Sequence, residues 1–148
     1  MSKKFKGRVV LSGEVSGKAT VSRQAFNTSG SYFENMFAGR TDAAPCTDAA
    51  NKELYGKDLS GAILCIPTTV GSTMGGMCLM GMKAIGVGPQ ALLFSKPIDT
   101  LAAAGVLMSD IWKDARIVTV DMLGDEFLET VQMGDTIAVH EDGTVEVG

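Results

Sequence analysis

A loop rich in hydroxyl groups and glycine is the stretch of this chain best suited to chemistry. The apolar run from Ala62 to Ile66 precedes it, and residues 68–76 contain only Thr, Val, Gly, Ser and Met. A helical pattern then begins at about Met74 and ends near Gly86. The first amides of a helix have no partner inside the helix, and the helix dipole favours negative charge there. The sequence therefore predicts an anion site in this loop, with Ser72 at its centre.

Composition limits the classes of protein to which the chain can belong. Its 148 residues predict one domain spanning residues 1–148. The net charge of −4, from 17 acidic and 13 basic residues, argues against nucleic acid as a partner. No apolar run is long enough to predict a membrane span, and the basic N-terminus lacks the apolar stretch of a signal peptide.

The cysteines indicate the redox environment. There are three, without a CxxC pair, and Cys65 and Cys78 lie in apolar runs where cysteine behaves as a small buried residue. This usage favours a reducing, cytoplasmic location over a disulfide framework. The single histidine, His140, lies at the end of a predicted hairpin and is expected to be exposed and structural.

The order of the predicted elements indicates an α/β fold. Two strands at Lys6–Leu11 and Glu14–Val21 are predicted to form a hairpin through Ser12-Gly13. The remaining predicted elements are buried strands at 62–66, 91–94 and 116–120, a buried helix at 98–108, a short helix from 124 and a closing hairpin at 134–147. This order predicts a barrel-like β layer, formed by the two ends of the chain, packed on a β-α layer.

Two segments between these elements are less regular. Residues 23–39 contain five aromatic or Met side chains among small polar residues. The segment is either a surface loop that packs aromatics on the core or one that faces a partner or covers a substrate. Its flanking arginines, Arg23 and Arg40, are either solvated or available to a carboxylate substrate. Residues 41–57 are predicted to be a long polar excursion.

Four short motifs, in this order and spacing, resemble the aconitase X swivel domain over residues 6–147. They are LYGKDLSGAIL at 54–64, GST at 71–73, GVGPQAL at 86–92 and GDTIAV at 134–139. The resemblance implies a swivelling β/β/α domain that forms the separate small subunit in two-subunit members of the family. It also implies a heteromeric partner, the aconitase X large subunit, which holds all or most of an iron–sulfur cluster and with which the small subunit performs a dehydration.

The resemblance also implies roles for residues in the loop. Ser72 would be the base that removes a proton next to a carboxylate, with backbone amides and glycines stabilising its alkoxide. Thr73 and the backbone of Gly71 and Gly75 would bind that small carboxylate substrate. The alternative is that Ser72 only caps the helix, a role that serine fills well. Cys46, which lies outside the apolar runs, is a candidate to reach a cluster across the subunit interface.

Two substrates are known for this family, namely cis-3-hydroxy-L-proline and a phosphorylated mevalonate. The loop at residues 27–51 departs from the Trp-Gly-Gly type of the archaeal small subunits and is more similar to the bacterial two-subunit form. This difference favours hydroxyproline, with phosphomevalonate as the alternative. A third possibility, from another class of protein, is a binding or regulatory module that holds a small anion without chemistry.

Overall fold

The structure is a computed structural model that describes residues 2–148. Its strands are β1 (Lys3–Lys6), β2 (Arg8–Leu11), β3 (Val15–Val21), β4 (Phe26–Asn27), β5 (Ile63–Ile66), β6 (Thr69–Val70), β7 (Ala91–Phe94), β8 (Val118–Asp121), β9 (Thr136–Val139) and β10 (Thr144–Val147). Its helices are α1 (Thr28–Ala38), α2 (Gly75–Ala84), α3 (Thr100–Lys113) and α4 (Asp125–Thr130).

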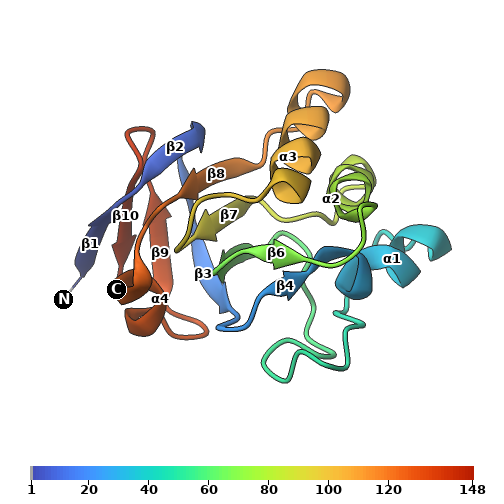
Figure 1. Ribbon diagram of the computed structural model, residues 1–148, viewed down its shortest axis with the longest axis horizontal. Coiled ribbons are helices and arrows are strands. Elements are labelled where there is room, and N and C mark those ends of the chain that lie inside the picture. Colours follow the sequence, from blue (N-terminus) through green and yellow to red (C-terminus); the bar gives the residue numbers. More distant parts are fainter. Residues whose placement is uncertain (1) are drawn as a thin grey trace.

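The main sheet nearly closes on itself at the start of the chain. Its eight strands follow the order β1-β10-β9-β3-β5-β7-β8-β2, so β1 and β2 occupy opposite edges although only Gly7 separates them. The amide of Gly7 donates to Gly143 O at 3.0 Å, and a Cβ at Gly7 would lie 2.5 Å from Asp121 O. A glycine is therefore required where the chain passes between the two edges of the barrel-like sheet (Figure 1).

The middle of the sheet is parallel and lies between the two layers of the fold. β3, β5, β7 and β8 pair in parallel, and all residues of β5 and β7 are buried. Ile63 and Cys65 of β5 belong to the core inside the barrel, whereas Leu64 and Ile66 belong to the core under the helices. Burial of both faces explains why these strands read as continuous apolar runs. The predicted α/β fold, a barrel-like layer packed on a β-α layer, is confirmed (Figure 1).

The predicted N-terminal hairpin is wrong. β2 pairs with β8, and β3 pairs with β9 and β5, so the two segments are not paired with each other. The Ser12-Gly13 connection is a corner that lies against β8, because a Cβ at Gly13 would lie 2.5 Å from Cγ2 of Val118. The closing hairpin of β9 and β10 is confirmed.

The prediction of a buried helix after Pro97 is also wrong in part. α3 buries only one face, through Ala102, Gly105, Val106 and Ser109. Its other face leaves Ile111 and Trp112 exposed. Gly105 permits the close approach of α2, since a Cβ there would lie 2.9 Å from Gly76 O. Small residues, rather than apolar residues on every face, therefore determine how this helix packs.

Residues 26–38, for which a surface loop was one prediction, form β4 and α1 instead. The side chain of Asn27 caps α1 by accepting from Gly30 N, and Gly39 ends the helix with a left-handed φ of 65°. The small polar residues that suggested a loop are typical of a helix start. No helix within residues 2–148 has both the length and the apolar character needed to cross a membrane.

Candidate functional site

Two short strands bring the starts of α1 and α2 together. β4 pairs in parallel with β6, with Phe26 opposite Thr69 and Asn27 opposite Val70. α1 begins directly after β4, and α2 begins a few residues after β6. The two strands run side by side toward these helices in Figure 1. The loop at residues 71–74 therefore lies beside the first turn of α1, which sequence reasoning did not foresee.

Gly71 is held against the cap of α1. Oδ1 of Asn27 accepts from Gly30 N at 2.9 Å and from Oγ of Ser29 at 3.2 Å. Gly71 has a φ of 108°, and a Cβ there would lie 2.4 Å from that same Oδ1. Both the backbone conformation and the close approach therefore require glycine at this position.

Asp99 anchors the other end of the loop. As the cap of α3, its carboxylate accepts from Ala102 N at 3.1 Å, and it also accepts from Thr69 Oγ1 at 2.6 Å and from Thr68 Oγ1 at 3.2 Å. Burial alone would raise the pKa of Asp99, but the hydrogen bonds from Thr69, Ala102 and Thr68 outweigh it and lower the pKa. Asp99 is thus an ionised anchor that joins β6 to α3. The two threonines maintain the loop structure.

Ser72 lies exposed at the turn before α2. Its Oγ accepts from Met74 N at 3.1 Å, and its carbonyl accepts from Gly75 N at 2.9 Å. Met74, not Ser72, occupies the cap position of α2 and makes no side-chain bond there. The Gly75 amide is thus used within the turn, whereas the amides of Gly71, Ser72 and Thr73 donate to no other group within residues 2–148. The loop thus presents the Ser72 hydroxyl oxygen, which accepts a hydrogen bond from the Met74 amide, beside three amides that are unpaired.

Ser72 opens onto a pocket of about 350 Å³. The pocket is lined by Ser29, Gly30, Phe33 and Glu34 of α1 and by Ser72 and Met74. The four α1 residues share one face because 29 and 33, like 30 and 34, are one helical turn apart. One of the two predictions for the aromatic segment was that it faces a partner or covers a substrate, but that prediction did not indicate Glu34. The spacing of residues on one helical face would have indicated Glu34, but the small polar residues of the segment hid the helical pattern.

Exposed apolar side chains line this pocket or lie close to its residues in the sequence. They are Phe33, Phe37, Val70, Met74 and Met77. Phe33 and Phe37 lie one helical turn apart, with ring centroids 4.6 Å apart. Exposed apolar side chains concentrated in this way are typical of a surface covered by another chain.

The hypothesis that Cys46 reaches a cluster across the subunit interface stays a prediction, but the burial of Cys46 in this chain argues against it. Cys46 is 1% exposed and belongs to the core under the helices. Its amide donates to Lys57 O at 2.9 Å, which holds the segment inward. Cys65 and Cys78 are buried as well, and within residues 2–148 no three His, Cys, Asp or Glu side chains are grouped to hold a metal ion. The described residues of this chain therefore do not fit an iron–sulfur cluster.

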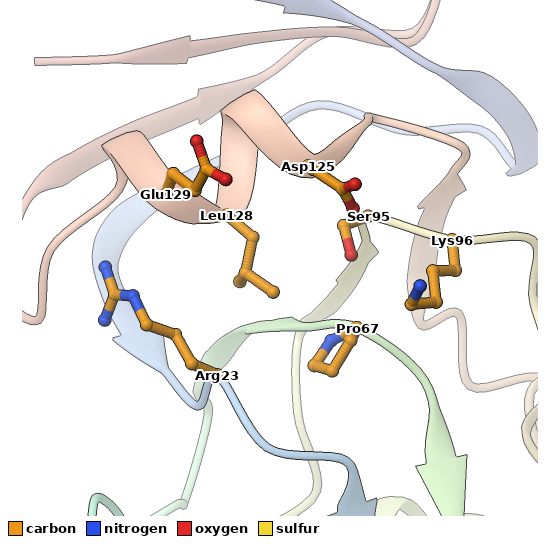
Figure 2. Close-up of a pocket in the computed structure, with 7 residues that line it drawn as sticks. All are labelled: Arg23, Pro67, Ser95, Lys96, Asp125, Leu128 and Glu129. Carbon is orange, nitrogen blue, oxygen red and sulfur yellow. The ribbon is translucent and has the colours of Figure 1, made fainter.

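A second pocket, of about 260 Å³, lies between α4 and the ends of the parallel strands. Figure 2 shows Leu128 and Pro67 facing each other across it, with Lys96 and Asp125 at the rim. Arg23 also lines it, but its guanidinium donates to Val131 O at 2.6 Å and pairs with Glu53. Both predicted substrate-facing arginines are therefore paired within the chain, because Arg40 pairs with Asp42. None of the predicted loop residues lines this pocket.

The fold and the site together define a swivelling β/β/α domain with an exposed serine at a helix start. The family described as the aconitase X swivel domain matches residues 4–147, and the chain belongs to this family. The resemblance found in the motifs is thus confirmed.

The small-subunit relative agrees with this chain in length, and a solved relative agrees with it in fold. The phosphomevalonate dehydratase small subunit of Archaeoglobus fulgidus is 30% identical over 145 residues, which cover 97% of this chain and 98% of that protein. A cis-3-hydroxy-L-proline dehydratase of Hypocrea jecorina is 29% identical over 96% of this chain but only 25% of that protein. The crystal structure of Thermococcus kodakaraensis aconitase X in its holo-form matches with a TM-score of 0.81 and 27% identity, covering 99% of this chain and 98% of that chain.

Proposed function

We propose that this chain is the small subunit of a cytoplasmic, heteromeric hydro-lyase of the aconitase X type. In this proposal it is inactive alone, and it supplies Ser72 and a carboxylate-binding loop to a site completed by a large subunit. Two observations support these separate roles of the small and the large subunit. The chain matches small subunits along nearly their whole length, and its candidate site is an open pocket whose lining includes the exposed apolar side chains of Phe33 and Met74.

The position of Ser72 is the observation on which the proposal mainly depends. A dehydration removes a proton from the carbon next to a carboxylate, and the hydroxyl on the following carbon leaves with its bonding electrons while a double bond forms, so that the proton and the hydroxide together make one water. In the proposed mechanism the Ser72 oxygen takes that proton. The Met74 amide, 3.1 Å from Oγ, stabilises the charged form of the serine, and the unpaired amides from Gly71 to Thr73 hold the substrate carboxylate.

The iron–sulfur cluster belongs to the large subunit in this proposal. It would supply an electrophile for the leaving hydroxyl. We assign no step of the reaction to a cluster held by this chain, because its three cysteines are buried. This chain contributes a base, a carboxylate site and one wall of the pocket.

For the substrate we propose cis-3-hydroxy-L-proline, with phosphomevalonate as the alternative. The pocket lining has one charged side chain, Glu34, and no cation among the described residues. A substrate with both a carboxylate and a phosphate would need positive charge that this wall does not supply. The full-length relatives support the alternative, since they are named phosphomevalonate dehydratase small subunits.

The test is a Ser72→Ala variant assembled anaerobically with the large subunit. We expect kcat to fall at least about 100-fold, the low end of what a general base contributes, while the complex still forms. Ser16→Ala is the matched control, because Ser16 is an exposed serine on β3 away from the loop. Near-normal dehydration by Ser72→Ala would instead favour a module that binds a small anion without chemistry.

A further inference from the structure

Glu34 is the charged residue of the Ser72 pocket that the proposed mechanism does not use. It lies on the face of α1 that also carries Ser29, Gly30 and Phe33. Within residues 2–148 its carboxylate takes part in no hydrogen bond or ion pair, and Arg40, six residues further along the chain, is paired with Asp42 at 2.7 Å. The Glu34 carboxylate is exposed at the pocket and is therefore available to a ligand.

The pocket thus combines two opposite recognition elements. On the α2 side, Ser72 lines the pocket, and the amides of Ser72 and of its neighbours Gly71 and Thr73 are unpaired donors that suit a carboxylate. On the α1 side, Glu34 is an acceptor that suits a cation. In an α-amino acid the ammonium and the carboxylate are attached to the same carbon, so a ligand of this class would meet both elements within one small pocket.

We propose that Glu34 binds the ammonium group of a zwitterionic amino-acid substrate and determines the specificity of the site. The inference rests on the proposed function, because it assigns a role within the same pocket. Glu34 would hold the ring nitrogen of a hydroxyproline while the loop amides hold its carboxylate. A dianionic substrate without an ammonium group would be repelled by the same side chain.

The first experiment separates substrate binding from chemistry in the assembled two-subunit enzyme. We expect Glu34→Gln to raise KM for cis-3-hydroxy-L-proline about tenfold or more, with kcat changed less than about threefold. Gln preserves size and helix propensity, so the fold is retained. Glu129→Gln, on α4 and away from this pocket, is the matched control and should leave KM unchanged.

The second experiment does not depend on turnover. Calorimetry of the complex should show that L-proline binds more tightly than cyclopentanecarboxylate, which lacks the nitrogen, and that Glu34→Gln removes this preference. Hydroxyproline turnover with an unchanged preference would overturn the role of Glu34 and leave the dehydratase proposal standing. A complex that binds no proline, or whose affinity for phosphomevalonate is unaffected by Glu34→Gln, would also overturn it. If Glu34→Gln removes the preference for L-proline in a complex that dehydrates neither substrate, the role of Glu34 would be supported and the dehydratase proposal contradicted.

Discussion

Single residues in the site loop are fixed by contacts with segments distant in the sequence. Gly71 lies against the side chain of Asn27, and Thr69 donates to Asp99 on α3. Neither contact is apparent from the loop itself. The position of the Ser72 oxygen thus depends on the close approach at Gly71 and on the anchor at Asp99.

A Gly71→Ala variant tests this close approach. Alanine at a φ of 108° is strained, and its Cβ would overlap Oδ1 of Asn27. Gly86→Ala is the matched control, because its φ is 88° but no atom lies within 4 Å of an added Cβ. We expect Gly86→Ala to cost about 1–2 kcal/mol of unfolding free energy, and Gly71→Ala about 1–3 kcal/mol more, measured by urea denaturation. Equal costs would mean that Asn27 moves aside freely.

At the scale of elements, two strand pairs of different kinds have separate roles. The parallel pair β4–β6 positions the site, and the antiparallel hairpin β9–β10 completes the barrel. The hairpin is joined at its end by His140, whose Nε2 lies 2.6 Å from Glu146 and whose Nδ1 lies 3.5 Å from Glu14. The hydrogen bond to Glu146 is the main cause that raises the pKa of His140. Desolvation opposes this rise, and Glu14 adds a smaller contribution that also raises the pKa. His140 is thus structural, as predicted, although its ring is only partly exposed.

This pair predicts a pH dependence of stability. Because the folded pKa of His140 lies above its ordinary value of 6.5, its contribution is fully present below pH 6.5 and is lost as the pH rises through the folded pKa. The Glu146 pKa is lowered, so its contribution is lost only in acid. We expect Tm to fall between pH 6 and pH 8.5, and His140→Gln to reduce that fall. An identical Tm profile in the variant would contradict the assignment.

At the scale of the whole molecule, the two most exposed large apolar side chains among the described residues lie at separate places. Phe37, which is 74% exposed, belongs to the group around the Ser72 pocket, and Trp112, which is 73% exposed, lies near the end of α3. In Figure 1, the C-terminal end of α3 lies away from α1 and from the loop that precedes α2. Under the proposed function only the first place faces the large subunit.

Variants at the two places test the docking face. We expect Phe37→Ser to weaken binding of the large subunit by about tenfold or more, because buried aromatic residues dominate interfaces. The stability of the isolated chain should change by less than about 0.5 kcal/mol, since the ring is exposed. Trp112→Ser is the control and should leave binding unchanged when both are measured by calorimetry. The opposite pattern would place the large subunit on α3.

The sequence by itself determined the parts of the fold that depend on local patterns. Apolar runs marked β5 and β7, Gly and Pro marked their ends, and the order of motifs led to the family. These signals are local. A strand that is buried on both faces is an unbroken run of apolar residues, and a turn is marked by the residue types at its own positions.

Only the tertiary structure decided which segments meet. It closed the barrel at Gly7, buried Cys46 although the surrounding sequence is polar, and turned an apparent loop into α1. It also brought Glu34 to the pocket of Ser72. The physical reason is that strand pairing and helix packing join residues far apart in the chain, and no local pattern records the partner of a strand.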